Sequence, residues 1–225
     1  MIEYYVHILK QYIPNFDSSS LVIFDIGSRD CKQSLEFASY FPNSSIYAFE
    51  CNPTTLSICR SNIENTKQIT LIDKAVNIYD GRCKFFPINS EKTITTWSDG
   101  NPGASSLFKA NGQYDIETYV QDEIEVDCTR IDTIMKKNNI NHVDIIWMDL
   151  QGAELLALES FGELINNVKF IHTEVSFKPM YEGQVLFSEI HDFLLNRGFT
   201  NITPIERKGW QSDIIYMRKQ KTNIL

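Results

Sequence analysis

Residues 21–27 read LVIFDIG, a continuous apolar run that ends in an acidic residue and a glycine. A run of this kind is typical of a parallel strand that is buried on both faces. Similar apolar runs recur at residues 45–50 (SIYAFE), 68–76 (QITLIDKAV), 142–149 (HVDIIWMD) and 169–176 (KFIHTEVS), and helical patterns lie between them. This alternation of strands and helices predicts an α/β fold, with a mostly parallel sheet and helices on both faces.

The C-terminal end departs from the alternation. Residues 199–206 (FTNITPIE) and 212–219 (SDIIYMRK) are two strand-like runs, with a turn expected around Lys208 and Gly209 and no helix between them. Such a pair predicts a hairpin, whose return strand is antiparallel to the others. A Rossmann dehydrogenase would more often continue the alternation to the end. We therefore expect a Rossmann-like sheet of seven strands with one antiparallel strand from the C-terminal hairpin.

The chain reads as one domain over residues 1–225, because its length suits a single α/β core and no linker-like stretch divides it. Apolar residues at helical spacing predict a leading helix over residues 2–13, which Pro14 would end. The core is expected over residues 21–219. A polar, glycine-bearing segment at about residues 90–119 has no clear period and predicts a long loop or lid.

Composition narrows the range of partners. The formal net charge is -8 and the lysines and arginines are scattered, which argues against a nucleic-acid partner. The five cysteines are widely spaced and form no CxxC pair, so we expect no structural zinc and a reducing, cytoplasmic location. No apolar run is long enough to predict a membrane span, and no secretion signal is recognised.

Acidic residues close the first two strands. In an open α/β sheet a ligand binds beyond the carboxyl ends of the strands, where the strand order reverses. Asp25 and Gly27 end the first strand and Glu50 ends the second, about 23 residues later, at a position from which a carboxylate accepts ribose hydroxyls. Alone, Asp25 could be a helix N-cap and Glu50 a solvated charge. Together they favour a nucleoside-containing cofactor, but not NAD, because the segment GSRDCK lacks the further glycines that a pyrophosphate requires.

The chain resembles the FkbM family of methyltransferases from about Leu21 to Phe199. The resemblance is carried by FDIG, YAFECNP, DKAV, NPGASSL, VDCTRIDTI, DIIWMDLQGAELLALES, HTEV and FKPMYEGQ, and MDLQGAE at residues 148–154 is the strongest piece. Membership would imply O-methyl transfer from S-adenosylmethionine, commonly to hydroxyls of sugars or natural products. Two departures stand out: Ser28-Arg29-Asp30-Cys31 replaces the usual A-N-x-G, and Trp147 replaces a frequent lysine.

S-adenosylmethionine is therefore the expected cofactor. We predict that its methionine end is held by Asp25, Gly27 and Ser28, and its ribose by Glu50 with help from Asn52. The adenine is expected beside Asp73, Lys74 and Ala75. The remaining predicted cofactor residues are Cys51, Asp149 and Gln151.

Methyl transfer to oxygen needs alignment of the two reactants and removal of a proton. Asp149, at the end of the strand 142–149, is the first choice for the general base, although it could instead cap the following helix. His172 and Glu174, on one face of the next strand, are the other catalytic candidates. A divalent metal on Asp149, Glu174 and Glu154 is possible in principle but is not expected, since no compact ligand motif supports it.

We expect the acceptor to be a sugar hydroxyl on a glycan or glycosylated metabolite. The predicted acceptor-binding residues are Trp97, Ser105, Ser106, Glu154, Tyr181 and Gln184. Two other functions stay open. An NAD(P)-dependent sugar oxidoreductase is disfavoured by the missing glycines and by the lack of a Tyr-x-x-x-Lys pair, and a non-catalytic binding subunit of the same fold would follow if the altered first loop had lost the cofactor.

Overall fold

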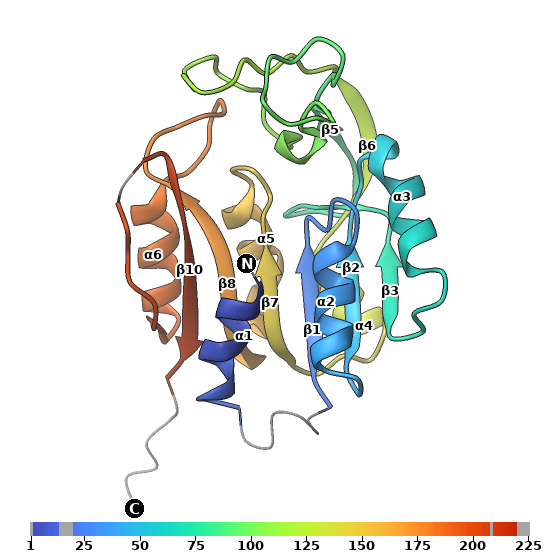
Figure 1. The fold of residues 1–225 in the computed structure, drawn as a ribbon. Helices are drawn as coiled ribbons and strands as arrows, with labels where there is room; N and C mark the ends of the chain where they lie inside the picture. The colour runs from blue at the N-terminus through green and yellow to red at the C-terminus, as the bar shows by residue number, and fades with distance from the viewer. Residues whose placement is uncertain (1, 14–19, 208, 220–225) are drawn as a thin grey trace, which may run out of the picture.

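The computed structural model describes residues 2–13, 20–207 and 209–219, which form a seven-stranded sheet flanked by helices (Figure 1). The strand order is β3-β2-β1-β7-β8-β10-β9. Every strand is parallel to its neighbour except β10, which pairs antiparallel with both β8 and β9. The predicted fold, with one antiparallel strand inserted by a C-terminal hairpin, is therefore confirmed.

The strands of this sheet are rich in β-branched and aromatic residues, which suit a buried pleated surface. β7 is buried at every position, as expected for a strand covered on both faces. The bounds are β1 Val22–Ile26, β2 Ser45–Phe49, β3 Ile69–Ile72, β7 Val143–Met148, β8 Val168–Ser176, β9 Phe199–Asn201 and β10 Gln211–Arg218.

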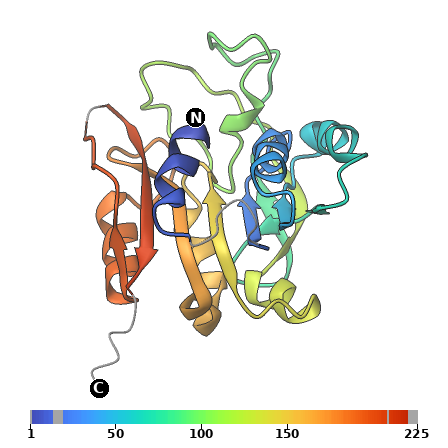
Figure 2. The ribbon, with the colours of Figure 1, turned by 60° about the horizontal axis from the view of Figure 1, so that its bottom comes forward.

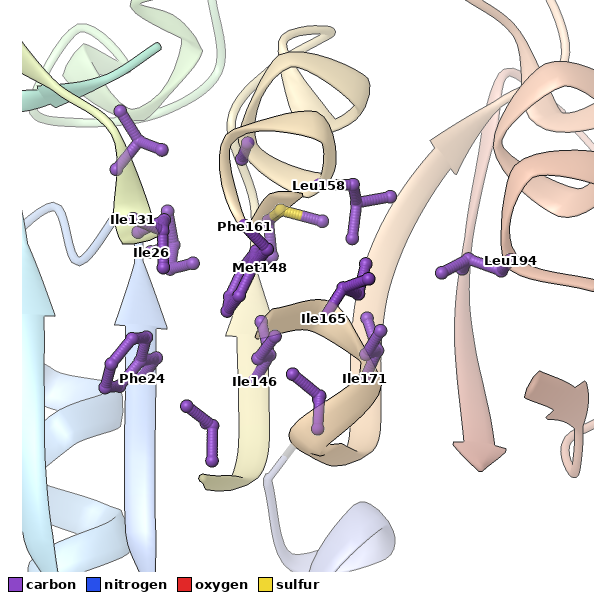
Figure 3. Close-up of a cluster of buried hydrophobic side chains, with 14 of the residues drawn as sticks. Phe24, Ile26, Ile131, Ile146, Met148, Leu158, Phe161, Ile165, Ile171 and Leu194 are labelled. Atoms are coloured by element: carbon purple, nitrogen blue, oxygen red, sulfur yellow. The ribbon is translucent and has the colours of Figure 1, made fainter. Parts of the chain in front are cut away.

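Three helices cover each face of the sheet (Figure 2). One face packs against α4 (Ile131–Lys137), α5 (Glu154–Ser160) and α6 (Phe187–Asn196), and Figure 3 shows side chains of this layer. The other face packs against α1 (Ile2–Lys10), α2 (Lys32–Tyr40) and α3 (Pro53–Ile63). Each fully buried aliphatic or aromatic side chain in these layers contributes about 1.5–3 kcal/mol relative to its exposed state, so the two layers fix the strand ends that form the site.

A second, smaller sheet was not predicted. It has the order β4-β6-β5, with β4 Ala75–Val76, β5 Gly81–Phe85 and β6 Ile124–Thr129. The expected continuous strand over residues 68–76 is wrong, because β3 ends at Ile72 and β4 pairs with β6 instead of with the main sheet. The break falls at Asp73 and Lys74, whose polar side chains favour a turn over a buried strand position.

Two other boundaries differ from expectation. The leading helix ends at Lys10 and continues as a turn to residue 13, and the strand expected over residues 199–206 is ordered as β9 only to Asn201. The expected turn residue Lys208 lies outside the described residues. No helix in the described ranges is long and apolar enough to cross a membrane.

The segment at residues 90–119 overhangs the end of the sheet toward which the parallel strands point (Figure 1). Its regular structure among the described residues is one short 3-10 helix, Pro102–Ala104, with isolated bridges such as Ile94 to Thr118. Another bridge joins Phe86 to Ser106. The segment is thus an ordered, irregular cover over the carboxyl ends of β1, β2, β7 and β8.

Candidate active site

Two cavities lie beside each other at the carboxyl ends of the strands, where the order reverses between β1 and β7. We call them the β2-side cavity, with about 560 Å³ of empty space, and the β8-side cavity, with about 1250 Å³. Both are lined by Gly27, Arg29, Gly103 and Asp149. Two ligands bound in these cavities would therefore meet at Asp149.

Glu50 lies in the β2-side cavity immediately after β2. Its carboxylate accepts backbone N–H bonds from Arg29 at 2.8 Å, Cys51 at 2.9 Å and Asn52 at 2.6 Å. Burial raises the pKa of Glu50 to about 7, although these bonds oppose the shift. Glu50 is thus a buried, rigidly held acceptor and not the solvated charge that it could have been.

The rest of the β2-side cavity combines polar groups on one side with an apolar wall. Asn52 caps α3 by accepting the Thr54 N–H at 3.1 Å, and its amide donates to Ser105 Oγ at 3.1 Å. Phe49 and Phe85 contribute to the apolar wall. Nine predicted site residues line this cavity: Gly27, Glu50, Cys51, Asn52, Lys74, Ala75, Ser105, Ser106 and Asp149. Asp73 does not line it but forms a surface ion pair with Arg60 at 3.2 Å.

Asp25, on β1, and Ser28, in the loop that follows it, are both buried and line neither cavity. Asp25 accepts a hydrogen bond from Ser34 Oγ at 2.5 Å, and Ser28 Oγ donates to the Asp25 carbonyl at 2.8 Å. Burial raises the pKa of Asp25 to about 6. The residue before α2 is Cys31, so Asp25 is not an N-cap; its contacts instead tie β1 to α2.

The first loop follows an unusual backbone path. Gly27, Arg29 and Cys31 have positive φ angles of 88°, 50° and 59°. A Cβ atom on Gly27 would lie 1.9 Å from the carbonyl oxygen of Asp149. Gly27 therefore lets β1 and β7 approach each other where the two cavities meet, and this position requires a glycine.

Asp149 and Glu174 are joined by one amide group. Gln151 Nε2 donates to Asp149 Oδ1 at 2.7 Å and to Glu174 Oε2 at 3.2 Å, and Gln211 Nε2 donates to the same Glu174 oxygen at 2.5 Å. Burial raises the pKa of Asp149, and burial together with the charge of Asp149 raises that of Glu174 well above its usual value. Because Asp149 does not cap α5, whose N-cap is Ala153, its carboxylate remains available to a ligand.

His172 lies on β8 and lines the β8-side cavity. Its ring stacks on Trp147, with centroids 3.5 Å apart and planes 7° apart, and the edge of Tyr5 packs against it at 4.5 Å. Asp213 Oδ1 is 3.2 Å from Nε2, but not in hydrogen-bonding geometry, and neither ring nitrogen has a hydrogen-bond partner among the described residues. An unpartnered buried imidazole facing a cavity is able to hydrogen-bond a ligand.

Three predicted acceptor residues form hydrogen bonds within the protein next to the cavities. Glu154 accepts the N–H groups of Leu150 and Gly152, and Gln184 bonds the backbone of Met180 and Tyr181. The Tyr181 hydroxyl, which is buried, donates to the Ala104 carbonyl at 2.8 Å and contacts Gln151 Oε1 at 3.1 Å. Within the described part of the chain, neither cavity is lined by Glu154, Tyr181 or Gln184.

The exposed Trp97 lines the β8-side cavity, and Arg29 lies over its ring at 5.3 Å while pairing with Asp99. Ser105 and Ser106, which were expected to hold the acceptor, lie on the β2-side cavity instead. The β8-side cavity also has lining residues that were not predicted, among them Glu117, Tyr114, Tyr119, Gln211 and Asp213. For Gln211 and Asp213 a signal existed, because the predicted hairpin places them beside the end of β8.

No group of three or more histidine, cysteine, aspartate or glutamate side chains within residues 2–13, 20–207 and 209–219 is arranged to hold a metal ion. The carboxylates of Asp149, Glu174 and Glu154, considered from the sequence as metal ligands, instead accept hydrogen bonds from amide groups. Metal independence stays a prediction, to be tested by chelation.

Comparisons with known proteins place the chain among methyltransferases. The family model of the FkbM methyltransferase domain matches residues 25–200. The 2-O-methyltransferase NoeI of Sinorhizobium fredii is 27% identical over 187 residues, which cover 82% of this chain and 75% of NoeI.

Solved structures share the fold at low sequence identity. The fibrillarin pre-rRNA processing protein of Methanococcus jannaschii matches with a TM-score of 0.53 and 11% identity, over 97% of this chain and 75% of that one. An rRNA methylase from Streptococcus thermophilus matches with a TM-score of 0.52 and 10% identity, over 98% and 99% of the two chains. The family model covers most of the chain, and this chain therefore belongs to the FkbM family of S-adenosylmethionine-dependent methyltransferases.

Proposed function

We propose that this enzyme transfers the methyl group to a sugar hydroxyl of a glycan or glycosylated metabolite. The observation that carries the proposal is the position of Asp149, which lines both the β2-side and the β8-side cavity. A carboxylate at this junction can orient an acceptor hydroxyl that enters from one cavity toward a group held in the other. The relation to NoeI, whose name describes it as a 2-O-methyltransferase, supports transfer to oxygen.

The β2-side cavity fits S-adenosylmethionine by the chemistry of its donors and acceptors. Glu50 offers carboxylate oxygens to ribose hydroxyls, and the wall that includes Phe49 and Phe85 suits an adenine ring. The bound cofactor supplies an electrophilic methyl group on a sulfonium. Asp25 is engaged with Ser34 instead of lining the cavity, so we expect backbone groups near Gly27 to contact the methionine end.

The residues of the chain then supply alignment and base catalysis. Gln151 fixes the carboxylate of Asp149 through a 2.7 Å bond, so little orientational freedom is left to lose on binding. The raised pKa of Asp149 makes it a better proton acceptor for a hydroxyl than an ordinary aspartate would be. We assign Asp149 as the general base and Glu174 as a second acceptor that orients the sugar.

The β8-side cavity has the mixed lining that carbohydrates require. Trp97, Tyr114 and Tyr119 offer aromatic faces on which a sugar ring can pack, and Glu174 and Gln211 offer hydrogen-bonding groups. A methyl-transfer assay with labelled S-adenosylmethionine and a panel of sugars, oligosaccharides, phenols and peptides tests the proposal. Labelling of saccharides is the expected result, and labelling of phenols or peptides alone would refute it.

Glu50→Ala should weaken binding of S-adenosylhomocysteine by roughly 1–3 kcal/mol, because the ribose hydroxyls lose a buried charged acceptor. Isothermal titration calorimetry measures the change. Glu64→Ala, which removes an exposed carboxylate beyond α3, serves as the control and should bind as the native protein does. An unchanged dissociation constant in Glu50→Ala would remove Glu50 from the cofactor site.

The pH dependence of kcat should reveal the base. Burial raises the pKa of Asp149 above its usual value of 3.8, so the ionised base is present above the raised pKa and is lost as pH falls through it. We therefore expect kcat to decline on the acid side with a midpoint above 3.8. A rate that stayed constant down to pH 4 would contradict the assignment.

A further inference from the structure

Three carboxylates cross the floor of the β8-side cavity in a row over three adjacent strands. Asp149 follows β7, Glu174 lies on β8, and Asp213 lies on β10 directly opposite Glu174 in the antiparallel register. The Gln151 amide links the first two. All three carboxyl groups line the cavity, so a ligand bound there would meet all of them.

A fourth carboxylate, on the overhanging segment, lines the same cavity. Glu117 accepts hydrogen bonds from Asn101 Nδ2 at 2.9 Å and from the Thr95 hydroxyl, and it is 9% exposed. Tyr114 and Tyr119 line the same cavity, and their rings pack against each other with centroids 5.6 Å apart. The lining of the cavity therefore combines carboxyl groups from the sheet and from the overhanging segment with aromatic rings.

Positive charge is scarce around these groups. Arg29 is the one lysine or arginine among the described residues that line this cavity, and it is already paired with Asp99. The hydrogen-bond donors to Glu174 and Glu117 are neutral amides and the hydroxyls of Thr95 and Tyr119. Asp213 lies 3.2 Å from His172 Nε2, whereas Glu174 and Glu117 have no lysine or arginine partner among the described residues. Partly buried carboxylates without a cationic partner are costly, and a cationic ligand offsets that cost.

His172 independently indicates that a ligand completes the cavity. It is 4% exposed and lines the cavity, and both of its ring nitrogens lack hydrogen-bond partners in the part of the chain that the structure describes. Buried polar atoms in folded proteins are nearly always satisfied. A ligand with hydroxyl groups would satisfy this imidazole beside the carboxylate row.

We propose that the acceptor carries an ammonium group, as in a sugar unit with a free amine, and that Glu117 and Glu174 bind it beside the Tyr114 and Tyr119 rings. Carboxylates and aromatic faces together form the environment that favours a bound ammonium ion. The same charges disfavour phosphorylated sugars, nucleotide sugars and uronic acids. This inference rests on the proposed function, because it names the acceptor of the same site.

The test compares each amino sugar with the neutral sugar of the same ring stereochemistry, which we call its neutral parent. The two compounds of a pair then differ only in the amino group. Methyl glycosides of glucosamine, galactosamine and mannosamine are titrated into the enzyme saturated with S-adenosylhomocysteine, alongside the corresponding glucose, galactose and mannose glycosides. We expect at least one amine to bind about tenfold more tightly than its neutral parent, which corresponds to about 1.4 kcal/mol. N-acetylation of the amine should abolish the preference, and added salt should reduce it.

Two variants assign the preference to the cavity. Glu117→Gln keeps the shape of the side chain and should reduce the preference for the amine to about threefold or less, since one of the two charges is lost. Glu91→Gln removes an exposed carboxylate of the same overhanging segment and should leave the preference unchanged. If no amine binds more tightly than its neutral parent, or if glucuronate binds more tightly than glucose, the proposal is overturned. Failure to bind S-adenosylhomocysteine at all would instead contradict the proposed function.

Discussion

Asp149→Asn should reduce kcat by about 10²- to 10⁴-fold, the usual contribution of a positioned general base. The variant keeps the size of the side chain and removes its ability to accept a proton. Because Asp149 borders the β2-side cavity without forming its ribose acceptor, the dissociation constant of S-adenosylhomocysteine should change by only about threefold or less. Steady-state methyl transfer and calorimetry give the two quantities.

Asp127→Asn is the matched control, since Asp127 is exposed on β6 and lines neither cavity. It should retain native activity. Circular dichroism of both variants checks that they fold. Full activity in Asp149→Asn would remove this residue from the mechanism, and a comparable loss in Asp127→Asn would show that the effect is not specific to the site.

Gly27→Ala should lower the free energy of unfolding by about 3 kcal/mol or more, because two costs combine. The added Cβ atom would lie 1.9 Å from the Asp149 carbonyl oxygen, a backbone atom that cannot move away without separating β1 from β7. The φ angle of 88° is also strained for any residue with a side chain. Urea denaturation monitored by circular dichroism measures the change.

Gly112→Ala separates the two costs. Gly112 has a φ of 73°, but nothing lies within 4 Å of a Cβ atom built on it. The free energy of unfolding of Gly112→Ala should therefore fall only by the conformational cost, about 1 kcal/mol. Equal losses in the two variants would show that the contact with Asp149 adds nothing to the requirement for glycine at position 27.

The sequence was sufficient to predict the main sheet and the edge of it at which the two cavities lie. Continuous apolar runs predict strands buried on both faces, and the acidic residues Glu50 and Asp149 at the ends of two of them line the cavity at that edge. Both positions could be predicted because each residue directly follows a strand in the sequence. The parallel arrangement then places them at one edge of the sheet.

The rest could not be predicted because it depends on contacts between distant segments. Glu117 and Tyr119 reach the β8-side cavity through an irregular segment with no periodic pattern. Asp25 matched a cofactor-binding position, but its side chain turns to Ser34 on the following helix. Tyr181 similarly appeared suited to stack on a sugar, whereas its hydroxyl bonds Ala104 within the protein. Side-chain direction at a strand end or in a loop is decided by packing, which the sequence alone does not show.

Transfer of a methyl group to a sugar oxygen is tested most directly by identifying the methylated atom. The enzyme is incubated with S-adenosylmethionine carrying a ¹³C-labelled methyl group and the saccharide panel, and the product is examined by NMR and mass spectrometry. We predict one labelled methyl ether on a ring hydroxyl, formed by the native enzyme and strongly reduced in Asp149→Asn. Label found on nitrogen, on a phenol or on a peptide, with no methyl ether of a saccharide, would contradict the account.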